Sequence, residues 1–253
     1  MRFTKLLVLA VTLVLVSSHA TFSQTSSTTT APAKPKTSTT TTSTYDRTLL
    51  KPSLLKEKAP DTYQVKFDTT RGEFTITVTR AWSPLGADRF YNLVKHHYFN
   101  GARIFRVVPG FVAQFGLSAY PPVNAAWRDA KIKDDSHNQS NKRGTIVFAT
   151  SGPNTRTTQL FINLKDNPSL DAQGFTPFGA VDGNGMNMVE MFYDQYGDNA
   201  GMDQENIEKG GEKYIATKWP KLDTIKSATI VGAAAPAGAA KPAAKPAAPK
   251  TQQ

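Results

Sequence analysis

The chain lacks cysteine and contains little histidine, and both shortages restrict its chemistry. The chain has 253 residues, with no cysteine and four histidines. Without a thiol there is no disulfide framework, no thiolate nucleophile and no thiolate metal site. Two of the histidines, His96 and His97, are adjacent near the end of a predicted helix, where their side chains diverge and a positive charge is favoured. We therefore predict no metal site.

Long apolar runs are also missing. Leu6 to Val16 is largely apolar but falls short of the roughly twenty residues that a membrane-spanning helix needs. Arg2 and Lys5 precede this run and the small-residue segment 18–20 follows it, which is the pattern of an export signal. An uncleaved amphipathic start is the alternative. We expect residues 1–20 to be a signal peptide and the mature chain to be exported, periplasmic or extracellular, without stable membrane insertion.

Acidic residues are fewer than basic ones, with Asp+Glu 20 against Lys+Arg 30 and a net charge of +10. Part of the excess lies in two low-complexity ends, because residues 21–44 are mostly Ser, Thr, Ala, Pro and Lys and residues 233–253 mostly Ala, Pro and Lys. Such segments bury too little apolar surface to offset the entropy lost on ordering. We predict a disordered linker over 21–60, a folded unit over 61–231 and a disordered tail over 232–253.

The basic ends allow two interpretations. They could bind anionic envelope surfaces or nucleic acid, or they could be solubilising tails. The ends show no alternation of basic and aromatic residues of the kind that stacks bases. We expect solubilising tails and no nucleic-acid partner.

The folded unit contains many short strand patterns and few helical ones. Residues 63–68 and 74–78 alternate apolar and polar side chains around a turn, which predicts a hairpin. Further strands are expected at 103–108, 111–115, 144–149, 159–164, 176–181 and 225–231. Pro177 suggests that the 176–181 strand lies at an edge or carries a bulge. The absence of a βαβ rhythm predicts a mainly β fold, a closed antiparallel β-barrel capped by helices.

Two helices are expected to cover this barrel. The first begins at Ser83-Pro84, with the Ser83 hydroxyl as its cap and proline in the first turn. Its apolar face is predicted to comprise Phe90, Leu93, Val94 and His97. The second is a short helix over 185–192. The intervening segment 127–143 is polar and reads as a loop, and its acidic pair, Asp134 and Asp135, fits a solvated charge run better than an acid–base pair.

One stretch, residues 105–114, combines a cation and a carboxamide with apolar side chains. Alternation places Arg106 and Val108 on one strand face and Phe105 and Val107 on the other. No acid, histidine or thiol is nearby in the sequence. A cation beside an apolar floor suits an apolar substrate that needs one strong hydrogen-bond donor, and it excludes most hydrolytic chemistry.

Three motifs in order resemble the cyclophilin family of peptidyl-prolyl cis-trans isomerases. They are FRVVPGFVAQ at 105–114, FATSGPNTRTTQLFI at 148–162 and LDAQGFTPFG at 170–179. The resemblance spans residues 62–231. It implies an eight-stranded barrel with a helix closing each end, isomerisation of Xaa-Pro bonds without a cofactor, and proline-containing polypeptides as partners of a monomeric protein.

The resemblance also implies site residues. Arg106 matches the catalytic arginine, and Gln114 matches the glutamine that holds it and a substrate carbonyl. Ala149 and Thr150 match positions whose backbone lies along the peptide, and Gln159 matches a residue lining the site. The remaining matches form the proline pocket: Phe111, Val112, Phe161, Leu170 and, in place of a histidine, Phe175.

Two departures affect the expected specificity. Many eukaryotic members carry Trp where this chain has Ser169, so we expect weak binding of cyclosporin. The segments 117–141 and 199–221 differ from compact members and are expected to reshape the rim of the site. A cyclophilin-like module that binds proline segments without isomerising them remains the alternative function.

Overall fold

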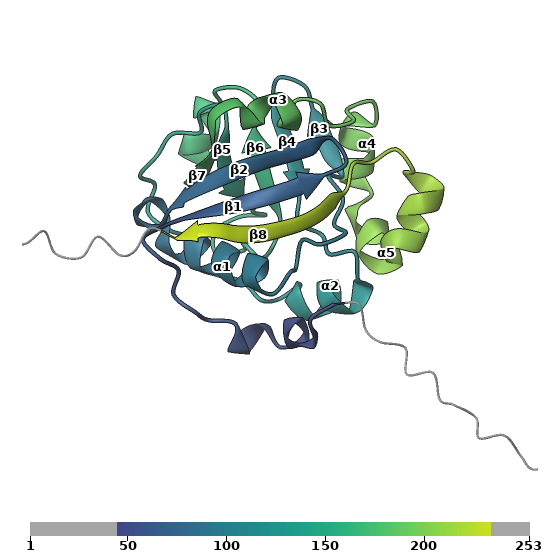
Figure 1. Cartoon of the computed structure of the whole chain (residues 1–253), viewed down its shortest axis with the longest axis horizontal. Coiled ribbons are helices and arrows are strands. Elements are labelled where there is room, and N and C mark those ends of the chain that lie inside the picture. The colour runs from purple at the N-terminus through teal and green to yellow at the C-terminus, as the bar shows by residue number, and fades with distance from the viewer. Residues whose placement is uncertain (1–44, 234–253) are drawn as a thin grey trace, which may run out of the picture. The chain divides into compact units, whose positions relative to one another are not determined.

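Eight antiparallel strands form one curled sheet around the apolar core (Figure 1). The computed structural model describes residues 45–233, all within the compact unit Thr42–Gln253. The strands are β1 (Thr62–Thr69), β2 (Gly72–Thr79), β3 (Arg106–Val108), β4 (Val112–Phe115), β5 (Thr145–Phe148), β6 (Leu160–Asn163), β7 (Pro177–Val181) and β8 (Ile225–Ala233). Their order in the sheet is β3-β4-β6-β5-β7-β2-β1-β8. The predicted mainly β fold is therefore confirmed, and each predicted strand overlaps an observed one, although the strand predicted over 103–108 begins only at Arg106.

The sheet does not close fully into a barrel, which differs from the prediction. The edge strands β3 and β8 share no ladder, and the segments next to them, 101–104 and 223–225, meet at a bridge between Arg103 and Thr224. Beside it, the Ile104 amide donates to the Asp223 carbonyl over 3.0 Å. Closure is incomplete because β3 has only three residues, whereas β8 pairs along its length with β1.

Pro177 produces a bulge and not an edge. Strand β7 lies inside the sheet between β5 and β2. The β5–β7 register shifts between Ile146 and Val147, where Val147 faces Pro177. An irregular register tolerates the missing amide hydrogen of proline, and this explains how the residue occupies an interior strand.

The helices outnumber the two that were predicted. They are α1 (Pro84–Lys95), α2 (Pro121–Trp127), α3 (Met186–Val189), α4 (Gly197–Met202) and α5 (Gln204–Lys218). Figure 1 shows α1 and α3, the two predicted helices, on opposite sides of the β1–β2–β8 part of the sheet. The other three arise in segments expected to be loop or insertion. Helix α2 begins with two prolines, which a first helical turn accepts.

The core consists mainly of aromatic and branched side chains, and β1, β2 and α1 contribute a large share of its aromatic rings. Phe67 packs against Phe74 with ring centroids 5.1 Å apart and against Phe90 at 6.3 Å. Phe90, Leu93 and Val94 of α1 are buried as predicted, but His97 is exposed because the helix ends at Lys95 and His97 adopts a left-handed φ of 58°.

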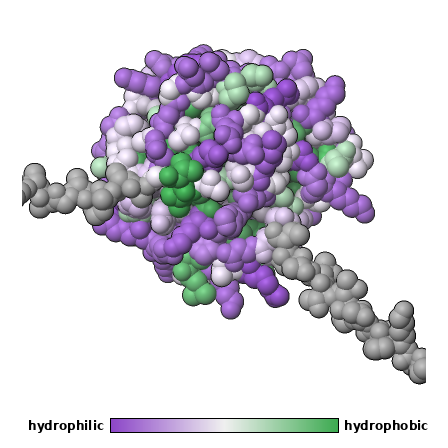
Figure 2. Space-filling model, viewed as in Figure 1, coloured by the Kyte–Doolittle hydropathy of each residue, from purple (hydrophilic) through white to green (hydrophobic). Residues whose placement is uncertain are grey.

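On the face seen in Figure 2, hydrophilic residues predominate and apolar ones form separate small patches.

Residues 45–60 are ordered, so the predicted linker over 21–60 is too long. This segment contains two short 3₁₀ helices, η1 (Arg47–Leu50) and η2 (Pro52–Leu54). Leu49 is 1% exposed, and its carbonyl accepts a hydrogen bond of 2.8 Å from the indole of Trp127. Leu49 and Ala59 belong to the core, and Leu50 and Leu55 pack against it, whereas Leu54 is exposed. Residues 1–44 and 234–253, with the predicted signal peptide and most of the tail, lie outside the described residues.

Asp135 is buried and paired, which corrects the prediction of a solvated charge run. Its side chain is 4% exposed and lies 3.1 Å from Nη1 of Arg156, whereas Asp134 is 40% exposed. Asp135 also accepts hydrogen bonds of 2.9 Å from the amides of Leu85 and Gly86 at the start of α1. Ser83, the predicted cap, instead donates its hydroxyl to Asp135 over 2.5 Å. The α1 cap therefore comes from a residue about fifty positions away.

Replacing Asp135 tests this cap. We expect Asp135→Ala to lower the free energy of unfolding by about 3 kcal/mol or more, because it leaves Arg156 buried beside fewer acceptors and removes the α1 cap. Asp134→Ala, the matched control, should cost about 1 kcal/mol or less because the side chain is more exposed. Denaturant unfolding of the three proteins measures both values. Equal losses in the two variants would contradict the assignment.

A second prediction concerns acid stability of the segment 45–60. Burial alone would raise the pKa of Asp46, but hydrogen bonds from Thr48 and His96 outweigh it and lower the pKa from 3.8 to about 2. A carboxyl whose pKa is lowered on folding adds stability above its unfolded pKa, and this stability is lost as the pH falls through the folded value. The stability difference between wild type and Asp46→Asn should therefore shrink from pH 4 to pH 2. A difference that stays constant over that range would refute the prediction.

Candidate active site

Arg106 and Gln114 face each other across the β3–β4 hairpin. The two residues are Cα partners in the ladder, and Nη1 of Arg106 donates to Oε1 of Gln114 over 3.2 Å. Phe105 and Val107 are both buried, Val107 in the main core and Phe105 in a separate apolar cluster with Ala200 of the later chain. The turn between the strands contains Gly110 with φ 67°, a conformation that glycine adopts without strain. The Arg106 guanidinium on β3 is therefore held in part by a hydrogen bond to the neighbouring strand β4.

A chain of side-chain amides continues from Gln114. Its Nε2 donates to Oε1 of Gln159 over 2.9 Å, and Nε2 of Gln159 donates to Oε1 of Gln204 over another 2.9 Å. Because the Arg106 guanidinium can only donate, the amide that faces it must present its oxygen, and this fixes which side of each amide along the chain carries the oxygen. The Gln114 oxygen therefore faces Arg106, and its Nε2 group faces Gln159.

An apolar pocket of about 200 Å³ lies beside Arg106. Phe161 and Phe175 form part of its wall, with ring centroids 5.5 Å apart at 71°. The volume is below the roughly 300–1,000 Å³ typical of drug-sized ligand sites, so the pocket suits one small apolar group. Nine of the ten predicted site residues line it: Arg106, Phe111, Val112, Gln114, Ala149, Thr150, Phe161, Leu170 and Phe175.

The tenth predicted residue, Gln159, lies in an adjoining polar hollow of about 190 Å³. This hollow shares Gln114, Ala149 and Thr150 with the apolar pocket and is completed by Gln204 and by hydroxyl side chains. The Ala149 amide donates to the Gln159 carbonyl over 2.9 Å, so it is already used within the protein. Within residues 45–233, the Thr150 amide donates no hydrogen bond, so of the two backbone amides expected along a substrate it is the one left for a ligand.

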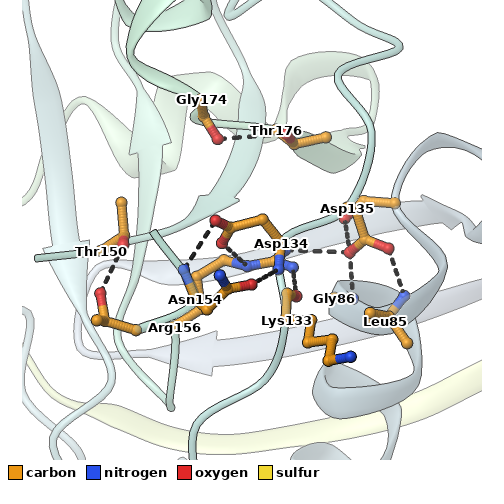
Figure 3. Close-up of polar contacts among 12 residues, drawn as sticks. Leu85, Gly86, Lys133, Asp134, Asp135, Thr150, Asn154, Arg156, Gly174 and Thr176 are labelled. Carbon is orange, nitrogen blue, oxygen red and sulfur yellow. Dashed lines mark hydrogen bonds and ion pairs between the residues drawn. The ribbon is translucent and has the colours of Figure 1, made fainter. Parts of the chain in front are cut away.

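The loop that carries Ala149 and Thr150 is tied down at several points. Thr150 shares a hydrogen bond of 2.8 Å with the Thr155 hydroxyl. One residue further, Arg156 is nearly buried, and Figure 3 shows its guanidinium between the carboxylates of Asp134 and Asp135. The ion pairs connect this loop to the start of α1. The backbone beside the pocket is therefore held by the body of the domain.

Helix α4 supplies contacts to Arg106 that the sequence analysis missed. Oδ1 of Asp198 accepts a hydrogen bond of 2.6 Å from Nε of Arg106. The Arg106 guanidinium also lies 5.6 Å from the centroid of the Phe111 ring. Among residues 45–233, the Nη2 group of Arg106 has no hydrogen-bond acceptor, and its side chain is 24% exposed. No motif signalled Asp198, because the contact joins residues that are 92 positions apart.

Ser169 is exposed on the short 3₁₀ helix η4 (Pro168–Gln173) and does not line the apolar pocket. Leu170, the next residue, is buried and faces the pocket. The rim beside Leu170 consequently carries a small polar side chain.

The chemistry of the site is that of a donor beside an apolar hollow. The residues lining the pocket include one cation and no carboxylate, imidazole or thiol. No acid–base pair or nucleophile in the lining is set up for proton transfer or covalent chemistry. Within residues 45–233, no cluster of three or more His, Asp or Glu side chains is arranged to hold a metal ion, and none of the helices is long and apolar enough to cross a membrane.

Comparison with known proteins identifies the family. The model of the cyclophilin-type peptidyl-prolyl cis-trans isomerase family matches residues 64–212. A peptidyl-prolyl cis-trans isomerase of Acinetobacter baylyi is 33% identical over 168 residues, which cover 64% of this chain and 88% of the relative. A peptidyl-prolyl cis-trans isomerase-like 1 protein of Aspergillus fumigatus is 31% identical over 129 residues, covering 50% of this chain and 79% of the relative.

A solved structure agrees at the level of the fold. The crystal structure of a Cryptosporidium parvum cyclophilin-type isomerase matches with a TM-score of 0.50 and 19% identity, over 68% of this chain and 98% of that one. The family model covers the strands that carry Arg106, Gln114 and Phe161. This chain belongs to the family of cyclophilin-type peptidyl-prolyl cis-trans isomerases.

Proposed function

We propose that this isomerase accelerates rotation about Xaa-Pro bonds in exported proteins during folding, with Arg106 as the catalytic donor. The observation that carries the proposal is the position of the Arg106 guanidinium at the edge of a pocket sized for one small apolar ring. A proline ring fills such a pocket, and its amide nitrogen then lies at the side from which Arg106 donates.

The physics of the peptide bond explains why one donor is sufficient. Rotation about Xaa-Pro crosses a barrier of roughly 18–20 kcal/mol and takes tens to hundreds of seconds without a catalyst. In the twisted transition state the prolyl nitrogen loses its resonance and gains a lone pair that accepts a hydrogen bond. A donor aimed at this nitrogen therefore stabilises the transition state more than either planar ground state.

A guanidinium suits this role because it is a rigid, charged and multidentate donor. Nε of Arg106 is engaged by Asp198 and Nη1 by Gln114, which leaves donor hydrogens on Nη2 for the substrate. The second Nε2 hydrogen of Gln114 is available for a substrate carbonyl, since only one is used by Gln159. No step requires proton transfer, a covalent intermediate or a cofactor.

The alternative function is a module that binds proline segments without isomerising them. A binder needs the apolar walls, such as Phe161 and Leu170, but gains nothing from a donor directed at the prolyl nitrogen. The joint presence of Arg106 and its two partners favours catalysis.

The setting of the reaction is proposed from the ends of the chain. The cationic start, the apolar run and the small residues at 18–20 support export to the periplasm or the exterior, and the lack of cysteine is compatible with either compartment. We propose that the protein acts there as a monomer on proline-containing polypeptides and does not bind nucleic acid.

Removing the donor tests the mechanism. We expect Arg106→Ala to lower kcat/KM on a proline-containing peptide by about 10²–10³, the loss seen when one donor to a transition state is removed. NMR exchange spectroscopy of the peptide measures cis–trans exchange directly. Arg143→Ala, which removes a cation paired with Glu190 outside the pocket, is the control and should match wild type.

The two outcomes that contradict the proposal are distinct. Peptide shifts on binding without faster exchange in wild type would favour the binding module. Full activity in Arg106→Ala would retain the isomerase but reject Arg106 as its donor.

Export is tested on the full chain expressed in a bacterial host. We expect cleavage close to Ala20 and recovery of the mature protein outside the cytoplasm, because the apolar run is long enough for a signal peptide. Leu13→Arg interrupts that run and should leave the uncleaved chain inside the cell. N-terminal sequencing of each cell fraction measures both. Cytoplasmic, uncleaved wild-type protein would argue against a signal peptide.

A further inference from the structure

We propose that Asp198 of α4 is a positioning residue that holds the Arg106 guanidinium in its donating orientation, and that the segment 197–204 is built around this task. The inference rests on the proposed function of Arg106. It assigns a role to a segment that the sequence analysis regarded as a rim-shaping insertion.

The polar contacts of Arg106 form a path that starts and ends in this one segment. Asp198 accepts from Nε of Arg106 over 2.6 Å, and Arg106 donates to Gln114 over 3.2 Å. The path continues through Gln159 and returns to Gln204 at the start of α5. The guanidinium is therefore held from both sides, by the sheet through Gln114 and by α4 through Asp198.

Gly201 supports the stem of the same side chain. A Cβ atom at position 201 would lie 2.7 Å from Cδ of Arg106 and 3.0 Å from its Cγ. The backbone of α4 thus packs directly on the aliphatic part of Arg106, and only glycine leaves room for it. Asp198 and Gly201 are three residues apart and so share one face of the helix.

The helix is itself anchored in the domain. Ala200 is fully buried in an apolar cluster with Phe105, Leu117 and Ile207. Phe105 directly precedes Arg106, so the cluster fixes α4 against the chain beside the donor. A rigid support of this kind is needed, because displacing a reacting group by about 1 Å can reduce a rate by as much as 10².

The chain offers a matched control for Asp198. Glu212 of α5 comes from the same part of the chain and pairs with Arg103, three residues before Arg106. Its side chain is 52% exposed, compared with 57% for Asp198. Glu212→Ala therefore removes an equally exposed carboxylate and one ion pair without touching Arg106.

The first measurement is isomerase kinetics. We expect Asp198→Ala to lower kcat roughly fivefold with KM little changed, since an exposed ion pair is weak and its effect is on orientation. Asp198→Asn keeps a hydrogen-bond acceptor and should restore most of the activity. Glu212→Ala should match wild type. Wild-type kinetics in Asp198→Ala, or equal losses in Asp198→Ala and Glu212→Ala, would overturn the inference.

The second measurement does not depend on activity. In ¹⁵N NMR of the free protein, the Nε–H of Arg106 should be rigid in wild type and in Glu212→Ala, and mobile in Asp198→Ala. A rigid Nε–H in Asp198→Ala would overturn the inference even if activity fell. If wild type lacked isomerase activity, the proposed function would fail, and the NMR result would still decide whether Asp198 holds Arg106.

Gly201→Ala gives an independent variant that is expected to fold. Alanine is a better helix former than glycine, so the melting temperature should be retained. The added methyl group would displace the Arg106 stem and lower kcat on the order of tenfold. Unchanged kcat in this folded variant would contradict the packing role of α4.

Discussion

The register of three neighbouring strands is the constraint on which the site depends. Arg106 on β3 pairs with Gln114 on β4, and Gln114 pairs with Phe161 on β6. One row of residues across the sheet therefore contains the cation, the amide that orients it and a wall of the apolar pocket. A shift by one residue in either pairing would turn the members of this row to opposite faces of the sheet.

The rest of the domain supports that row from its two ends. On one side, the buried Arg156 ties the loop after β5 to Asp135 and to the start of α1. On the other side, α4 packs on the Arg106 stem and its carboxylate engages Nε. Both supports use ion pairs between segments that are distant in sequence. They locate the donor and the substrate backbone relative to the same sheet.

The apolar pocket and the Arg106 donor contribute differently to catalysis. An apolar pocket contributes binding that is the same for cis, trans and twisted forms of a peptide, and such uniform binding does not accelerate rotation. The directed donor contributes the part that distinguishes the twisted amide. Precise placement of one guanidinium therefore matters more than additional reactive groups, and this explains why so much of the polar network ends on Arg106.

Local pattern determined much of this protein. Alternating side chains at 63–68 and 74–78 predicted the first hairpin, and the three motifs predicted nine residues that meet in one pocket. The hairpin could be predicted because strand alternation and turn chemistry depend on adjacent residues, whereas the nine pocket residues were expected from the resemblance to the cyclophilin family. The tertiary structure alone decided that Asp135 caps α1 and that Asp198 contacts Arg106. It also decided that residues 45–60 pack on the domain and that β3 and β8 do not close the barrel fully. Each of these joins segments far apart in the chain, and their side chains carry no local signal of the partner that the fold brings to them.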